Sequence, residues 1–169
     1  MSSDPFRCRT ADPADGEALE RLERLAWTEL DTPELNRSGV VFGVRIPFAD
    51  VLVACWGAEL VGYVAIGQRT PFVSNQHIGV VRALVVDPRA RRSGIGLGLL
   101  TSAEREARAR GFGALRLTVM ATNERALALY KKAGWSELGR YPDEFQIGGR
   151  YIDDILMGKR LDVATVDGT

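Results

Sequence analysis

One strand–helix–strand segment restricts the fold more than any other part of the chain. His77–Val86 is rich in Val and predicts a strand, which Asp87-Pro88 ends. A turn rich in Arg and Gly over 89–96 leads into a helix with apolar periodicity to about Arg110, and Leu115–Val119 predicts the next strand. Two strands joined in this way run parallel through a right-handed crossover. We therefore expect a parallel strand pair covered by a helix.

The segments on either side predict antiparallel strands and further helices. Upstream, we expect a short strand at Phe6–Thr10, a helix from Asp12-Pro13 to about Thr28, and a hairpin with strands Val51–Trp56 and Leu60–Ile66. Asp31 to Asp50 predicts a short helix and loops, because Pro and Gly interrupt it. Downstream, the expected elements are a helix, two strands and the loop that joins them: Asn123–Ala133, Trp135–Arg140, Tyr151–Arg160 and Tyr141–Arg150.

Together these elements predict an α/β (α+β) fold. Its core is a mixed, mostly antiparallel central sheet of about six to seven strands, with helices on both faces. No repeat, low-complexity block or Pro/Gly/Ser-rich linker divides the 169 residues. We therefore expect a single domain over 1–169, with its core at about 6–161.

Charge and composition argue against several function classes. The chain has 22 Lys and Arg against 22 Asp and Glu, a formal net charge of zero, which does not favour a nucleic-acid surface. No apolar run approaches the roughly 20 residues that cross a bilayer, and the first residues lack the features of a secretory signal, so we expect a cytoplasmic protein. Cys8 and Cys55 are far apart and His77 is the only histidine. This pattern favours buried thiols and no metal site.

Residues 86–96 have the properties of a diphosphate-binding turn. A strand feeds a tight turn, and the turn feeds a helix N-terminus, whose N–H groups and dipole attract an anion. Gly94 and Gly96 allow a ligand to approach the backbone closely, and Arg91 and Arg92 add positive charge.

Two other phosphate-binding patterns do not fit this turn. A Walker A loop needs G-K-[ST], which is absent, and a dinucleotide fingerprint needs G-x-G-x-x-G after the first strand. Here Gly94, Gly96 and Gly98 are spaced G-x-G-x-G, and the strand is not the first. A Gly-rich turn with a solvated Arg run is the structural alternative that the turn alone leaves open.

A second segment, Asn123–Trp135, has helical geometry that suits a ligand site. Seven residues make about two turns, so Asn123 and Tyr130 lie nearly on one face of the helix. Each residue also has a common structural role. Asn often caps a helix N-terminus, and Tyr is often a half-buried core aromatic.

Both segments resemble motifs of the GNAT superfamily of acyl-CoA-dependent N-acetyltransferases. Residues 86–96 are similar to motif A, V-x-P-x-x-R-x-x-G-x-G, and 123–135 are similar to N-x-x-A-x-x-x-Y-x-x-x-G-[FW]. The element order agrees from about Phe6 to Leu161. One departure is Arg92, where the family often has Gly.

The resemblance implies a co-substrate, acetyl-CoA, and a set of site residues. Tyr130 is the implied general acid, since a tyrosine hydroxyl with a pKa near ~10 can give a proton or a strong hydrogen bond to the leaving thiolate. Backbone groups of the strand before the turn would receive the pantetheine arm and the thioester. The implied CoA-binding residues are Leu84, Val85, Val86, Arg91, Arg92, Ser93, Gly94, Ile95, Gly96, Asn123 and Tyr130.

The general base does not follow from the sequence. Many family members carry a glutamate in the strand before the turn, but Val80-Val81-Arg82-Ala83 contains no acid. The candidates are His77, which is more simply a surface residue, together with Asp143, Glu144, Glu29 and Asp31. A chain of water molecules would also serve.

The acceptor is implied only as an amine, in a small molecule or a peptide. In the family, the segments Trp27–Phe48 and Tyr141–Arg150 would define its site. They hold the acids above and the aromatics Trp27, Phe42, Phe48, Tyr141 and Phe145. Acids with aromatics suit a cationic amine, although scattered surface residues give the same list. The identity of the amine, an acyl group longer than acetyl and a homodimer all stay open.

Two functions compete with an active acetyltransferase. One is a domain of the same fold that holds acyl-CoA as a sensor without turnover, and the other is an interaction protein that binds neither substrate. Tyr130 favours activity because a pure binder needs no acid for the leaving group, whereas the missing base argues mildly against it.

Overall fold

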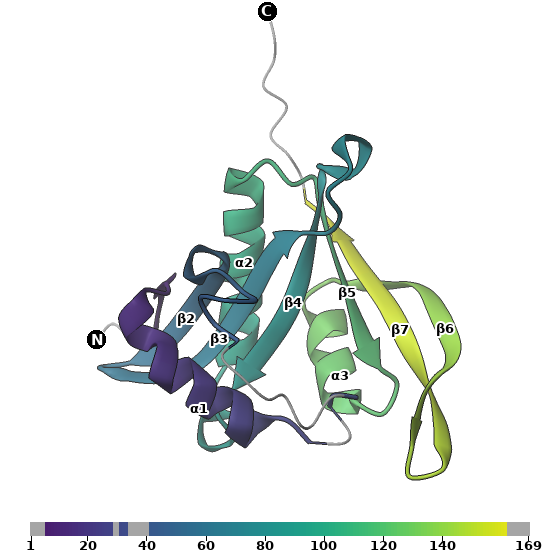
Figure 1. Cartoon of the computed structure of the whole chain (residues 1–169), viewed down its shortest axis with the longest axis horizontal. Helices are drawn as coiled ribbons and strands as arrows, with labels where there is room; N and C mark the ends of the chain where they lie inside the picture. Colours follow the sequence, from purple (N-terminus) through teal and green to yellow (C-terminus); the bar gives the residue numbers. More distant parts are fainter. Residues whose placement is uncertain (1–5, 29–30, 34–40, 162–169) are drawn as a thin grey trace, which may run out of the picture.

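The computed structural model describes residues 6–28, 31–33 and 41–161, and in this part of the chain a seven-stranded sheet carries three α-helices (Figure 1). The strand order is β1-β2-β3-β4-β5-β7-β6, and only β4 and β5 pair in parallel. The predicted mixed, mostly antiparallel sheet is therefore confirmed. The strands are β1 Arg7–Thr10, β2 Val51–Trp56, β3 Glu59–Gln68, β4 Ile78–Val86, β5 Ala114–Met120, β6 Ser136–Ile147 and β7 Arg150–Arg160; the helices are α1 Gly16–Ala26, α2 Ile95–Ala109 and α3 Glu124–Lys132.

Helices cover both faces of the sheet, as predicted. On one face α2 packs through Leu99, Leu100 and Ala103, and residues of α3 join the same apolar cluster. On the other face α1 packs through Leu19 and Leu22 against the inner residues of β2 and β3. The apolar spacing of each helix explains its orientation, because residues three and four apart share one face.

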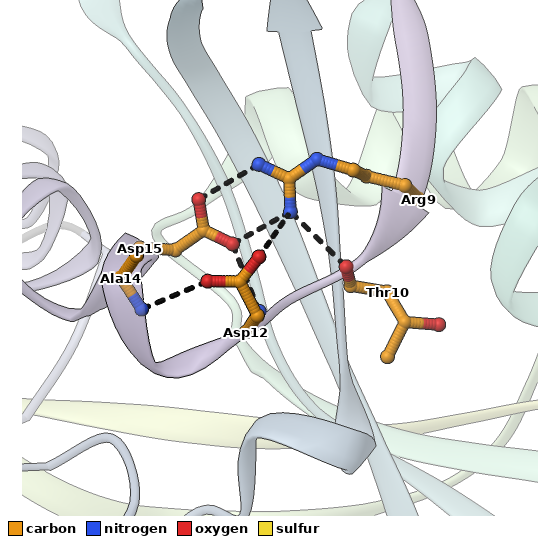
Figure 2. A network of polar contacts seen from close by, with 5 residues as sticks. All are labelled: Arg9, Thr10, Asp12, Ala14 and Asp15. Carbon is orange, nitrogen blue, oxygen red and sulfur yellow. Dashed lines mark hydrogen bonds and ion pairs between the residues drawn. The ribbon is translucent and has the colours of Figure 1, made fainter.

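A charged network fixes the start of α1 against the end of β1 (Figure 2). Arg9 donates to both oxygens of Asp15, at 2.6 and 2.8 Å, and Asp12 accepts from the backbone N–H of Ala14 at 2.8 Å. Asp15 in turn accepts from the N–H of Asp12 at 2.9 Å. Bidentate Arg–carboxylate contacts are directional, so this network sets the angle at which the chain leaves the sheet.

The parallel pair is short, and this shapes the site. β4 and β5 pair only where Ile78–Val80 lies beside Ala114–Arg116. Beyond that point β4 carries a register shift against β3, in which Arg82 is the extra residue between Val81 and Ala83. A bulge bends its strand and increases the local twist. The two strands then diverge toward the ends that carry Val86 and Met120 (Figure 1).

The predicted loop Tyr141–Arg150 is wrong. β6 continues through Ile147, and the connection to β7 is the two-residue turn Gly148-Gly149 with φ of 57° and 77°. Two glycines at positive φ match the twist of a two-residue hairpin, so pairing with β7 extends the strand. A register shift between Tyr141 and Phe145, with Asp143 at φ 54°, is what remains of the expected irregularity.

Other boundaries differ by small amounts. α1 ends at Ala26, two residues before the predicted Thr28, and β4 begins at Ile78 and not at His77. The expected short helix between 31 and 50 is a 3-10 turn at Phe48–Asp50; residues 34–40 of that segment lie outside the described residues.

Candidate active site

A cavity of about 740 Å³ lies where β4 separates from β5. It runs along the end of β4, over the start of α2 and beside α3. Its lining includes almost the whole set predicted from the sequence, the exception being Ser93. The described residues that line it are Ala26, Trp27, Asp31, Leu84, Val85, Val86, Pro88, Ala90, Arg91, Arg92, Gly94, Ile95, Gly96, Leu97, Asn123, Arg125, Ala126, Leu129, Tyr130 and Lys132.

The turn presents unused backbone donors to this cavity. The first backbone bond of α2 runs from the N–H of Gly98 to the carbonyl of Gly94, at 2.9 Å. The N–H groups of Ile95, Gly96 and Leu97 therefore have no partner within the helix. Gly94 caps the helix at φ 83°, a conformation that glycine adopts without strain. With the helix dipole, these donors make an anion site.

Two arginines add charge in different ways. Arg91 is half-buried, and its Nη2 donates to the carbonyl of Ala26 at 3.3 Å. Burial lowers its pKa, with a smaller contribution from nearby Arg125. Arg92 is exposed and has φ 65°, in the left-handed region, which explains why a glycine suits this position. The turn thus accepts backbone strain at a residue that adds a positive charge.

Ser93 does not line the cavity. Its hydroxyl donates to the carbonyl of Ala90, which stabilises the turn from within. The role of Ser93 in CoA binding stays a prediction.

Tyr130 lies at the centre of the site. Its ring is 7% exposed and packs against Trp135 with ring centroids 5.8 Å apart. Burial raises the pKa of its hydroxyl well above the usual value, so the group stays protonated. Among the described residues, no hydrogen bond engages this hydroxyl. It is therefore available to a ligand.

Asn123 combines the structural role with a place in the site. Its Oδ1 accepts from the N–H of Ala126 at 3.0 Å, so it is the N-cap of α3. It also lines the cavity together with Tyr130, as their seven-residue spacing predicted.

A second, smaller cavity of about 210 Å³ adjoins the first between the diverging strands. The two share Trp27, Asp31, Leu84, Asn123, Ala126 and Tyr130. The smaller cavity is further lined by Thr32, Pro33, Val81, Arg82, Ala83, Leu117, Thr118, Val119, Met120, Phe145 and Asp154. Tyr130 therefore stands at the junction of two spaces, one beside the phosphate turn and one beside β5 and β7.

The carboxylates that were candidates for the general base differ in their surroundings. Asp31 lines both cavities, but Arg125 pairs with it at 3.1 Å and the Thr28 hydroxyl donates to it at 2.7 Å. Asp143 and Glu144 are exposed and line neither cavity. Glu29 lies outside the described residues.

His77 is far from the site along its strand. It precedes the first residue of β4, whereas the cavity begins at Val81 and Leu84, and it is exposed. It therefore serves neither cavity. Its carbonyl accepts from the N–H of Gly113 at 2.8 Å, which joins the ends of the crossover.

Two of the aromatics expected around the acceptor lie beside a cavity. Trp27 and Phe145 line the smaller cavity, and the indole of Trp27 donates to Glu23 at 2.9 Å. Phe42 is instead a core residue that packs edge-on against Tyr63, and neither Phe48 nor Tyr141 lines a cavity.

Sequence reasoning missed one carboxylate, Asp154 on β7. It is 9% exposed and lines the smaller cavity. Burial raises the pKa of its carboxyl, while a hydrogen bond with the Thr118 side chain opposes this shift. A signal was present in the sequence, because Asp153-Asp154 interrupts an apolar strand that runs from Ile152 to Met157.

Residues 6–28, 31–33 and 41–161 lack two features, a metal-binding cluster and a membrane-spanning helix. No group of three or more His, Cys, Asp or Glu side chains there is placed to hold a metal ion. No described helix is long and apolar enough to span a membrane.

The sheet divides beyond a short parallel pair, and the helix after β4 begins with free N–H groups that favour an anion, which suits an enzyme whose co-substrate carries phosphate. Residues 16–135 match the Acetyltransferase (GNAT) family, so the chain belongs to that family and is an acetyltransferase. The resemblance seen in the sequence is confirmed, with acetyl-CoA as co-substrate. An IAA acetyltransferase from Azospirillum brasilense is 30% identical over 129 residues, which are 76% of this chain and 69% of that protein.

Solved structures share the fold of this chain. The protein smu.2055 from Streptococcus mutans has a TM-score of 0.85 and 27% identity, covering 92% of this chain and 99% of its own. The protein yncA from Salmonella typhimurium, solved with acetyl-CoA, has a TM-score of 0.80 and 20% identity, covering 93% and 94%. At that identity the second likeness shows the fold alone.

Proposed function

We propose that this enzyme transfers an acetyl group from acetyl-CoA to a primary amine by direct attack in a ternary complex. The observation that carries the proposal is that Tyr130 lines both of two cavities that differ in character. The larger would hold acetyl-CoA and the smaller the amine, so that both substrates are present together.

The larger cavity suits CoA along its whole length. The diphosphate would take the N–H groups of Ile95, Gly96 and Leu97 and the charges of Arg91 and Arg92. The pantetheine arm would follow Leu84–Val86, where β4 has no ladder partner in β5. The thioester would then lie beside Tyr130, with backbone groups of β4 available to the developing oxyanion.

Tyr130 would assist the departure of the thiolate. Since burial raises the pKa of its hydroxyl, the group is always in the donor form at neutral pH. A donor in a site with little water stabilises a nearby anion more strongly than it would in bulk solvent. Tyr130 would thus supply a hydrogen bond, and finally a proton, to the CoA sulfur.

The acceptor would be small or would enter as a chain end, because the smaller cavity measures about 210 Å³. Trp27 and Phe145 give it aromatic walls, Asp154 adds a carboxyl group, and Asp31 adds a carboxylate that is paired with Arg125. A primary amine on a compact or aromatic carbon skeleton fits this lining.

The experiment is a screen of amines monitored by free CoA, followed by initial-velocity kinetics on the best acceptor. Direct attack predicts intersecting double-reciprocal lines when both substrates are varied. Parallel lines would indicate an acetyl-enzyme intermediate and would overturn the ternary-complex mechanism.

A further inference from the structure

The smaller cavity contains two acidic side chains, and they differ in their partners. Asp31 is neutralised by Arg125 at 3.1 Å and accepts from Thr28. Asp154 has no ion-pair partner among the described residues, and its hydrogen bonding includes the Thr118 hydroxyl, a neutral donor. Both carboxylate oxygens of Asp31 are thus engaged, one by a cation and one by a hydroxyl, which leaves them less accessible to an amine. Of the two, Asp154 is the better base.

The position of Asp154 is set by the register of three strands. It lies opposite Met120 of β5 and opposite Tyr141 of β6. Met120, Thr118 and Tyr130 all line the same cavity as Asp154. The carboxylate thus faces the space between β5 and the junction at Tyr130, on the side away from the phosphate turn.

We propose, on the basis of the proposed function above, that the Asp154 carboxylate is the base that takes the proton from the attacking amine. The neutral amine nitrogen attacks the thioester carbonyl and a C–N bond forms. The nitrogen then loses its proton to the carboxylate, the C–S bond breaks, and the thiolate takes a proton from the Tyr130 hydroxyl. The products are the amide and CoA thiol, and transfer of one proton from Asp154 to Tyr130 through solvent restores the enzyme.

The surroundings of Asp154 make its carboxylate a stronger base than an exposed aspartate. Burial raises the pKa of its carboxyl above the usual range for Asp, and Glu144 of β6 adds a smaller repulsion. Arg82 of β4 also lines the cavity, but its guanidinium donates to the Gln68 carbonyl at 3.0 Å. From α3 the facing group is the neutral Tyr130, and from the segment after α1 it is Asp31, paired with Arg125.

The test uses hydroxylamine as the amine, because it is small enough for any acceptor site and its product, acetohydroxamate, forms a coloured ferric complex. With Asp154→Asn we expect the enzymatic rate to fall by about 100-fold or more, the range of a lost general base. Affinity for CoA, measured by calorimetry, should stay within about twofold because Asp154 does not line the larger cavity.

Two further variants separate a chemical role from a structural one. Asp153→Asn is the matched control, since Asp153 is on the same strand, contacts Arg140 and the N–H of Asp143, and lines neither cavity. It should keep its rate. Thr118→Val removes the hydrogen bond that lowers the pKa of Asp154, so the acidic limb of the rate profile should move to higher pH.

The outcomes distinguish this proposal from the one on which it rests. Wild-type protein that fails to bind CoA would overturn the proposed function. Protein that binds CoA but forms no hydroxamate would overturn the assignment of the acceptor cavity. If Asp154→Asn keeps both its rate and its acidic limb, or Thr118→Val leaves that limb in place, Asp154 is not the base.

Discussion

Replacing Tyr130 by Phe should lower turnover and leave stability almost unchanged. Tyr130 lines both cavities, and no described residue forms a hydrogen bond with its hydroxyl. Loss of the hydroxyl breaks no bond to the described residues and keeps the ring packed against Trp135, so the free energy of unfolding should change by less than about 1 kcal/mol. Turnover should fall by about 10²–10⁴-fold, or about 3–5 kcal/mol in the barrier.

The assay pairs kinetics with denaturation and CoA calorimetry. The dissociation constant for CoA should stay within about threefold, because the hydroxyl would act mainly on the leaving sulfur and little on bound CoA. The raised pKa of Tyr130 also predicts that ionisation of this group causes no decline in wild-type rate below about pH 10. An unchanged turnover number in Tyr130→Phe would refute the acid role.

Tyr63 provides a control with the same chemical change. Its hydroxyl is fully buried and donates to Glu23. Loss of that bond leaves a buried acceptor with one donor fewer, so Tyr63→Phe should lower stability by about 1–3 kcal/mol. Its effect on turnover should be less than about tenfold, since Tyr63 lines neither cavity.

Three further predictions concern the turn and the start of α1. Gly94→Glu should weaken CoA binding at least ~10-fold. Its control is Gly111→Glu, which is also at φ 83° but outside both cavities, and which should lower only the free energy of unfolding, by about 1–2 kcal/mol. Equal CoA affinities of the two variants would contradict this prediction. Arg92→Gly should relieve the strain at φ 65° and raise the unfolding free energy by up to about 1 kcal/mol, while CoA binding becomes less salt-dependent in titrations. Since Arg9 lowers the pKa of Asp15, the charged form of Asp15 stabilises the fold above about pH 4, and this stabilisation is lost on further acidification. The variant Asp15→Asn should therefore unfold at a lower urea concentration than the wild type at pH 7, and this difference in urea midpoint should be smaller at pH 3.

Local sequence was sufficient for the elements of the site that one segment builds. The Gly-rich turn at the start of α2 could be predicted because strand, turn and helix N-terminus follow one another within residues 86–96. The relation of Asn123 to Tyr130 could be predicted because helical periodicity alone places both on one face. Asn123 could also be predicted as the N-cap of α3, because Asn is common at that position, and the structure confirms it.

The positions of residues that depend on strand pairing could not be predicted from local sequence in this way. His77 begins the predicted strand that leads to the turn, and in the structure the whole extended length of β4 separates the two. Asp143 and Glu144 were expected in a loop that faces the acceptor, whereas pairing of β6 with β7 leaves them exposed. Such errors arise because strand register depends on partners distant in the sequence.

The sequence by itself thus determined the family, the order of the elements and the anion site, all of which depend on short-range spacing. Tertiary structure alone decided where β4 and β5 part, because a bulge at Arg82 and only three paired positions set that point. It also placed Asp154 and Tyr130, which are 24 residues apart in the sequence, in the lining of one cavity. A cavity between strands is a property of their separation, and no local pattern of residues encodes that distance.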